Sequence, residues 1–211
     1  MWYCGALSAF RRREFKEVQH LAEGLRGYAR DHGVPHWAQF AICLEGAALA
    51  AAGRADQGII LIQEGIRTCE ATRSQAFRPA FLAGLAEAQL RAGRWDEAEQ
   101  TIETALRGTE HTFERWMDAE LWRLKGQVAT LSRRHTPEQA EALFRRAAAC
   151  ADRQGSRPLH LRALTSLARL WGAQRRSNEV RDLLGPIYGW FTEGFDAPDL
   201  REARVLLDAV R

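Results

Sequence analysis

A helix-breaking segment returns in this chain about every forty residues, and this period limits the possible fold more than any other feature. Its clearest copies are residues 53–58 and 93–98, and the five copies end at residues 18, 58, 98, 140 and 180, with spacings of 40, 40, 42 and 40. A fixed period of this size is typical of stacked helical hairpins, each of which covers its neighbour's apolar face. The chain is therefore predicted to be an α-solenoid, which offers a long binding surface and no obvious reaction centre.

The segments between these breaks consist almost entirely of helix-forming residues, and no alternating run of β-branched residues predicts a strand. We expect one all-α domain over residues 1–211, a right-handed superhelix of about five hairpins closed by a final helix. The hairpins are predicted at about 2–31, 36–73, 77–108, 114–154 and 158–191, and the capping helix at 198–210. Their individual helices are predicted at 2–11, 14–31, 36–52, 55–73, 77–92, 95–108, 114–133, 136–154, 158–174 and 177–191.

Small residues recur where the two helices of a hairpin should cross. In the hairpin around Gly93, Ala86 and Ala98 allow the helices to approach closely, and Ile102 fills the space between them. The equivalent close-approach positions elsewhere are Gly46, Gly126 and Ala168.

Composition excludes several classes of function. The 211 residues carry 30 basic and 27 acidic side chains, a net charge of +3 that argues against a nucleic-acid or acidic-membrane partner. No apolar run reaches the roughly twenty residues needed to cross a bilayer. None of the cysteines forms a C-x-x-C pair, and three of the four lie in apolar helical stretches, as expected of buried thiols in a reducing cytoplasm. These three are Cys43, Cys69 and Cys150.

No motif supports catalysis, a cofactor or a metal. The glycines lack the Lys-Ser/Thr ending of a phosphate-binding loop. His32 and His36 are four residues apart, but Gly33 and Pro35 prevent a shared helical face, which disfavours a metal site there. We therefore expect a protein that is not an enzyme and that has no catalytic, cofactor-binding or metal-binding residues.

The spacing of apolar residues within each hairpin resembles the tetratricopeptide repeat (TPR), a helix–turn–helix unit. The runs AELWRLKG (119–126), AEALFRRA (140–147), RALTSLARLW (162–171) and LGPIYGWFTEGFD (184–196), followed by DLREA (199–203), are similar to the C-terminal TPR region of large bacterial signalling proteins. In that family an adenylate/guanylate cyclase or another input domain precedes a predicted signalling ATPase and then the repeats. The resemblance covers the chain from about Phe10 onward. It carries over neither activity, because this sequence contains neither domain.

Two functions follow as hypotheses. The first is a non-catalytic protein–protein interaction or regulatory module, either stand-alone or the TPR arm of a signalling ATPase or cyclase. The alternative is a sensor in which a small effector enters the groove and changes the curvature of the stack. In TPR stacks the first helix of each hairpin lines the concave face, so a protein or peptide partner is expected there. The residues predicted to line it are Cys43, Ala47, Ala83, Glu87, Glu120, Arg123, Gln127, Arg162, Thr165 and Arg169, apolar toward the N-terminus and cationic toward the C-terminus. The arginines could equally be solvated surface charge.

The end of a solenoid exposes core residues and needs a cap. We expect Tyr188, Phe191 and Phe195 to pack beneath helix 198–210 and seal the last hairpin. The apolar face of that helix is predicted to consist of Leu200, Ala203, Leu206 and Leu207.

Overall fold

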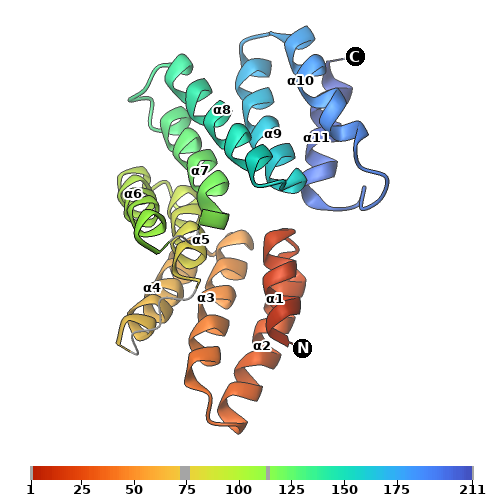
Figure 1. Ribbon diagram of the computed structural model, residues 1–211. Helices are drawn as coiled ribbons and strands as arrows, with labels where there is room; N and C mark the ends of the chain where they lie inside the picture. The colour runs from red at the N-terminus through yellow and green to blue at the C-terminus, as the bar shows by residue number, and fades with distance from the viewer. Residues whose placement is uncertain (1, 72–76, 113–114, 211) are drawn as a thin grey trace. The chain divides into compact units, whose positions relative to one another are not determined.

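The computed structural model describes residues 2–71, 77–112 and 115–210, and every regular element in these ranges is a helix (Figure 1). The chain forms two compact units, residues 1–108 and 109–211. A single domain over 1–211 thus stays a prediction, and each unit is described by itself. The helices are α1 (Trp2–Arg11), α2 (Phe15–Asp31), α3 (Pro35–Ala51), α4 (Ala55–Ala71), α5 (Arg78–Arg91), α6 (Trp95–Thr112), α7 (Asp118–Leu131), α8 (Pro137–Arg153), α9 (Arg157–Ala173), α10 (Ser177–Gly189) and α11 (Pro198–Ala209), with a 3-10 turn at Arg115–Met117 before α7.

The predicted helices are confirmed within one or two residues at most ends, with two corrections. Helix α6 continues to Thr112 instead of ending near Gly108, because Gly108 keeps a helical backbone and does not adopt the left-handed conformation that ends a helix. Helix α7 begins at Asp118, because Arg115–Met117 forms a 3-10 turn whose Arg115 carbonyl accepts a hydrogen bond from Gln154 Nε2 at 2.7 Å. The predicted ends near 73 and 114 lie outside the described residues.

The tight turns carry the forty-residue period in their backbone geometry. One residue in each turn has a positive φ, and these residues lie at 13, 53, 93, 133 and 175. Glycine adopts this conformation without steric cost at Gly53 and Gly93, whereas an arginine adopts it in the other three turns. The next amide donates back to the carbonyl five residues earlier in four of the turns (Glu14 to Ala9, Arg54 to Leu49, Arg94 to Gln89, Arg176 to Trp171), as in a Schellman cap.

In the first unit, α3 and α4 approach each other at backbone-contact distance, as expected for Gly46. A Cβ built on Gly58 would lie 2.4 Å from the Gly46 carbonyl oxygen, and one built on Gly65 would lie 2.3 Å from Cys43 Sγ. No real side chain fits at such distances, so the hairpin depends on these glycines. Ile62, fully buried, fills the space beside them.

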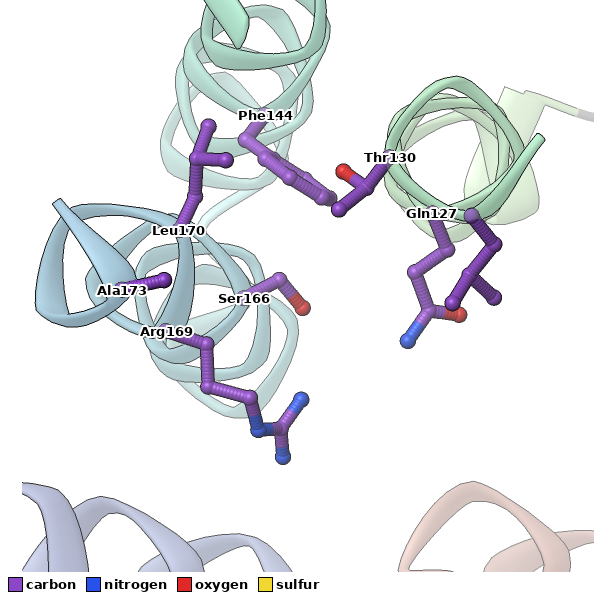
Figure 2. Close-up of a pocket in the computed structure, with 8 residues that line it drawn as sticks. Gln127, Thr130, Phe144, Ser166, Arg169, Leu170 and Ala173 are labelled. Carbon is purple, nitrogen blue, oxygen red and sulfur yellow. The ribbon is translucent and has the colours of Figure 1, made fainter. Parts of the chain in front are cut away.

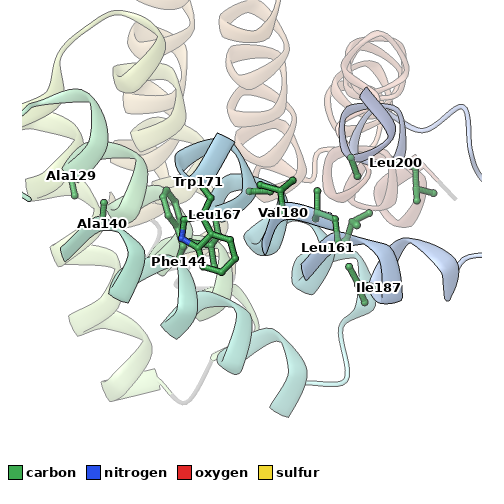
Figure 3. Packing of buried hydrophobic residues seen from close by; sticks show 12 residues of the cluster. Ala129, Ala140, Phe144, Leu161, Leu167, Trp171, Val180, Ile187 and Leu200 are labelled. Carbon is green, nitrogen blue, oxygen red and sulfur yellow. The ribbon is translucent and has the colours of Figure 1, made fainter. Parts of the chain in front are cut away.

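In the second unit, one apolar core runs from α7 through α8 and α9 to the last two helices (Figure 3). Phe144, Leu167 and Trp171 lie at its centre, and Val180 and Leu184 extend it into α10. Helices α10 and α11 both pack against α9. The second unit is therefore held together largely through α9.

Helix α11 closes this core as predicted. Leu200 and Ala203 are buried, and Leu206, Leu207, Tyr188 and Phe191 pack against the same cluster. Phe195 departs from the prediction: its ring lies 5.8 Å from that of Tyr188, but the residue is 46% exposed. The reason is that the loop bearing Phe195 turns at Gly194, where φ is +73°, before α11 begins.

The expected burial is confirmed for the two predicted cysteines whose side chains the structure describes. Cys43 and Cys150 are buried free thiols, and Cys4 is an exposed one. Burial raises the pKa of the Cys150 thiol, and the charge of Asp118 adds to the effect. The Cys69 side chain lies outside the described residues.

The glycine contact between α3 and α4 gives a matched pair of substitutions. Gly58→Ala places a methyl group against the Gly46 backbone and should lower the free energy of unfolding by about 1–3 kcal/mol. Gly27→Ala in α2 is the control, because nothing lies within 4 Å of its added Cβ; it should raise stability by up to about 1 kcal/mol through helix propensity. Urea denaturation measures both, and equal effects would contradict the close approach.

Candidate binding site

In the second unit, four buried charged side chains from α7, α9 and α11 pair with one another. Glu120 and Arg123 lie one turn apart on α7, Arg162 lies on α9 and Asp199 lies in the first turn of α11. Arg123 Nη2 donates to Glu120 Oε1 at 2.6 Å and its Nε to Glu120 Oε2 at 3.0 Å. Arg162 Nη2 and Nε donate to Asp199 Oδ2 at 2.7 and 3.0 Å, and Arg162 Nη1 lies 3.4 Å from Glu120 Oε2. We call these four residues the ion network.

The ion network overturns both readings of its arginines, an open cationic groove and solvated surface charge. The exposed fractions of its side chains are 4% for Arg123, 8% for Arg162, 7% for Glu120 and 11% for Asp199. Two guanidinium groups face two carboxylates, so the formal charges cancel. Buried arginines need such partners, because an unpaired charge removed from water is very costly.

A pocket of about 210 Å³ lies between α7 and α9 in the same unit (Figure 2). Phe144 of α8 contributes to one side of it, and Leu131 and Leu170 add apolar walls. Phe144 and Leu170 lie on one side in Figure 2, whereas the amide of Gln127 and the guanidinium of Arg169 point to the opposite side. The complete lining is Gln127, Thr130, Leu131, Phe144, Ser166, Arg169, Leu170 and Ala173.

The two hydroxyl groups of the lining are engaged within their own helices. Thr130 Oγ1 donates to the Gly126 carbonyl at 2.9 Å, and Ser166 Oγ donates to the Arg162 carbonyl at 3.1 Å. Such local bonds satisfy a hydroxyl's donor without a ligand. The pocket wall is therefore mainly apolar in character, despite its polar residues.

The predicted residues of the second unit lie in different surroundings. Gln127 and Arg169 line the pocket, and Ser166, a pocket residue, lies 3.5 Å from Arg123 Nη1 of the ion network. Thr165 is buried and donates to the Leu161 carbonyl at 2.8 Å. Arg169 is exposed and forms an ion pair with Glu202 of α11.

The predicted residues of the first unit are either buried in the packing between helices or held in an ion pair. Cys43 Sγ is 3.8 Å from the Ile62 carbonyl oxygen inside the α3–α4 hairpin, and Ala47 and Ala83 are buried. Glu87 is half-buried and pairs with Arg91 at 2.9 Å. Partner binding by the ten predicted residues stays a prediction.

Sequence reasoning missed most of the pocket lining. Phe144 belongs to the second helix of its hairpin, whereas the prediction placed only first-helix residues on the binding face, and Phe144 lines the pocket. Leu131 is 47% exposed near the end of α7, and an exposed leucine close to a turn is the signal that could have pointed to it. Ser166 and Leu170 lie one residue from predicted positions on α9.

A carboxylate on α8 fixes α9 to this helix. Glu141 Oε2 accepts from Trp171 Nε1 at 2.7 Å and from Arg176 Nη1 at 3.1 Å, and Arg145 pairs with the other carboxylate oxygen. The guanidinium groups of Arg145 and Arg176 lie over the Trp171 ring, 5.2 and 4.2 Å from its centre. Partial burial alone would raise the pKa of Glu141, but the hydrogen bonds from Trp171, Arg145 and Arg176 outweigh it, so the pKa is lowered.

Two further searches gave negative results within the described part of the chain. No three or more His, Cys, Asp or Glu side chains gather where they could hold a metal ion. None of the described helices has the length and apolar character needed to cross a membrane.

The chain is similar to solved TPR-like structures. Two crystal structures of a putative kinesin light chain with nearly identical TPR-like repeats, from Podosopora anserina, match it. One of them, a single-substitution form, is 17% identical over 87% of this chain and 90% of its own, with a TM-score of 0.57. The other is 16% identical over 98% of this chain and 93% of its own, with a TM-score of 0.54. No family model and no curated protein matches the chain. The fold is thus an all-α solenoid of TPR-like hairpins.

The ion network predicts a large cost for removing one partner. Arg162→Met should lower the free energy of unfolding by about 3–5 kcal/mol, because the buried carboxylates of Asp199 and Glu120 lose a counter-charge. Arg204→Met is the control: it breaks the exposed Arg204–Asp208 pair on α11, which water screens, and should leave the unfolding midpoint nearly unchanged. Urea denaturation measures both variants, and equal unfolding midpoints would contradict the stabilising role of the ion network.

The lowered pKa of Glu141 predicts a pH-dependent contribution to stability. The folded state favours the carboxylate, so its contribution is complete above the unfolded pKa, near 4.5, and is lost as pH falls through the lower folded value. Glu141→Gln should therefore be less stable than the parent at neutral pH, and the difference should shrink below about pH 4.5. Thermal melts across this range measure it, and a difference independent of pH would show that the charge of Glu141 is irrelevant.

Proposed function

We propose that this protein is a non-catalytic protein-interaction module, in which the pocket between α7 and α9 receives an apolar side chain from a partner. The observation that carries the proposal is the pocket itself, built on first helices of adjacent hairpins with Phe144, Leu131 and Leu170 as its apolar lining. TPR-like repeats form extended binding surfaces of this kind. The similarity to TPR-like solved structures supports the fold on which the proposal rests.

The size of the pocket favours a partner's side chain over a free effector. Pockets that enclose drug-sized molecules measure about 300–1,000 Å³. The present one measures about 210 Å³, which suits a single large apolar side chain. The rest of a bound segment would then lie outside the pocket, and the Gln127 amide and the Arg169 guanidinium, which point to the same side in Figure 2, could contact it.

A finer assignment rests on the sequence alone. The C-terminal runs at 162–171 and 184–196 are similar to the TPR region of bacterial signalling ATPases and cyclases, so we propose that the module serves as a regulatory arm of such a protein or as a stand-alone relative. The partner surface would then regulate a neighbouring catalytic domain. Reading the coding frame upstream of Met1 tests this placement, and an unrelated preceding domain would count against it.

Leu131 provides the test of the pocket. It is 47% exposed, so Leu131→Glu should leave the unfolding midpoint nearly unchanged while placing a charge in the apolar lining. Peptides selected on the whole protein by random phage display should carry a large apolar anchor, and Leu131→Glu should weaken them at least tenfold by fluorescence polarisation. Val205→Glu is the matched control, because Val205 is 67% exposed on α11 and does not line the pocket.

Two outcomes would contradict the proposal. Selected peptides that bind Leu131→Glu as tightly as the parent would place the binding surface elsewhere. Peptides weakened equally by Leu131→Glu and Val205→Glu would indicate a general effect of added acidic charge rather than occupation of the pocket.

A further inference from the structure

The pocket has one charged side chain among its eight lining residues, and that side chain already holds a carboxylate. Arg169 of α9 lines the pocket and pairs with Glu202, which α11 supplies from outside it. We propose that the pocket recognises a partner segment in which an acidic side chain neighbours the apolar anchor, with the partner's carboxylate displacing Glu202 from Arg169. This inference rests on the proposed function and adds to it the charge of the partner and an internal competitor.

Exposure separates this ion pair from the ion network next to it. The side chain of Arg169 is 45% exposed and that of Glu202 is 29% exposed, whereas those of Arg123 and Arg162 are 4% and 8% exposed. An exposed pair contributes little net free energy, because water and salt screen it. One carboxylate can therefore replace another at Arg169 at small cost. The buried arginines could exchange their partners only by leaving a carboxylate unpaired inside the protein.

Guanidinium geometry suits a carboxylate ligand at this position. Arginine presents a planar set of N–H donors that match the two oxygens of a carboxylate. The Gln127 amide, on the same side of the pocket in Figure 2, can donate a hydrogen bond to the same ligand. Glu202, a side-chain carboxylate, already pairs with Arg169, so we take a partner's acidic side chain, and not a chain terminus, as the ligand.

The pairing also links the pocket to the capping helix. Asp199 and Glu202 lie three residues apart on α11 and face Arg162 and Arg169, which lie seven residues apart on α9. A partner that replaces Glu202 leaves the buried Arg162–Asp199 pair intact, so α11 keeps its main polar attachment. Helix α11 should therefore stay folded against α9 when a ligand binds.

Two matched dipeptides test the inference on the whole protein: acetyl-Glu-Leu-amide and its neutral isostere acetyl-Gln-Leu-amide. Titrations are followed by the backbone amide shifts of Ser166 and Leu170 in NMR spectra at constant ionic strength. The acidic probe should bind about two- to fivefold more tightly than the neutral one. Glu202→Gln should raise the affinity of the acidic probe by a similar factor and leave the neutral probe unchanged.

Further variants separate recognition from structural damage. Arg169→Gln and the double variant Arg169→Gln/Glu202→Gln should bind both probes equally, and the double variant leaves no unpaired charge behind. Asp208→Asn, which removes another paired carboxylate from α11, should change neither affinity. A third probe, acetyl-Gln-Leu with a free terminal carboxylate, should bind no more tightly than its amide.

The outcomes distinguish the two proposals. If both dipeptides bind equally to the parent and to Glu202→Gln, the apolar pocket stands and the acidic partner is overturned. If only the probe with the free terminal carboxylate gains affinity, the ligand is a chain terminus and the acidic side chain is again overturned. If neither dipeptide shifts the pocket amides at millimolar concentration, the pocket is not a receptor, and both proposals fail.

Discussion

The absence of a side chain at Gly126 is the constraint on which the second unit depends. A Cβ at this position would lie 2.5 Å from Cε1 of Phe144, so only glycine lets the phenyl ring of α8 lie directly against α7. The ring then serves two purposes, because it fills the hairpin core and also lines the pocket between α7 and α9. The contact between Phe144 and Gly126 thus belongs both to the hairpin core and to the candidate site. A substitution that changes the pocket at Phe144 would also disturb the packing of the hairpin.

The pairing of buried arginines with carboxylates leaves the pocket mainly apolar. Arginines on α7 and α9 would make this face strongly cationic if their charges were open to solvent. Instead, Arg123 and Arg162 are buried against Glu120 and Asp199, and the desolvation of each guanidinium is compensated by a carboxylate within hydrogen-bond distance. What remains accessible is an apolar recess with Arg169 beside it. The lining of this recess therefore carries one positive charge instead of several.

The helix α11 has a part in both the core and the charge pattern. Its apolar side covers the end of the core through Leu200 and Ala203, and its acidic residues Asp199 and Glu202 meet arginines of α9. A cap that only excluded water would need no such pairing. Of these two acidic residues, Asp199 is buried against Arg162, whereas Glu202 forms the more exposed pair with Arg169.

The sequence by itself determined the all-α fold, the hairpin period and the positions of close approach, because these depend on local properties: helix propensity, breaks at glycine and the size of one side chain. It also identified most of the capping face of α11, which follows from apolar spacing along a single helix. By the same logic it placed Gln127 and Arg169 on one face, and both line the pocket in the structure. The remaining features were decided by the tertiary structure.

Which arginine is buried and which is exposed depends on residues distant in sequence, since Arg162 meets Asp199 across 37 residues and Arg169 meets Glu202 across 33. The pocket likewise combines α7, α8 and α9, and the outward turn of Phe195 depends on the path of one loop. Spacing along one helix does not show what lies opposite a side chain. Pairing, burial and cavities belong to the packing of several helices, and only the tertiary structure fixes them.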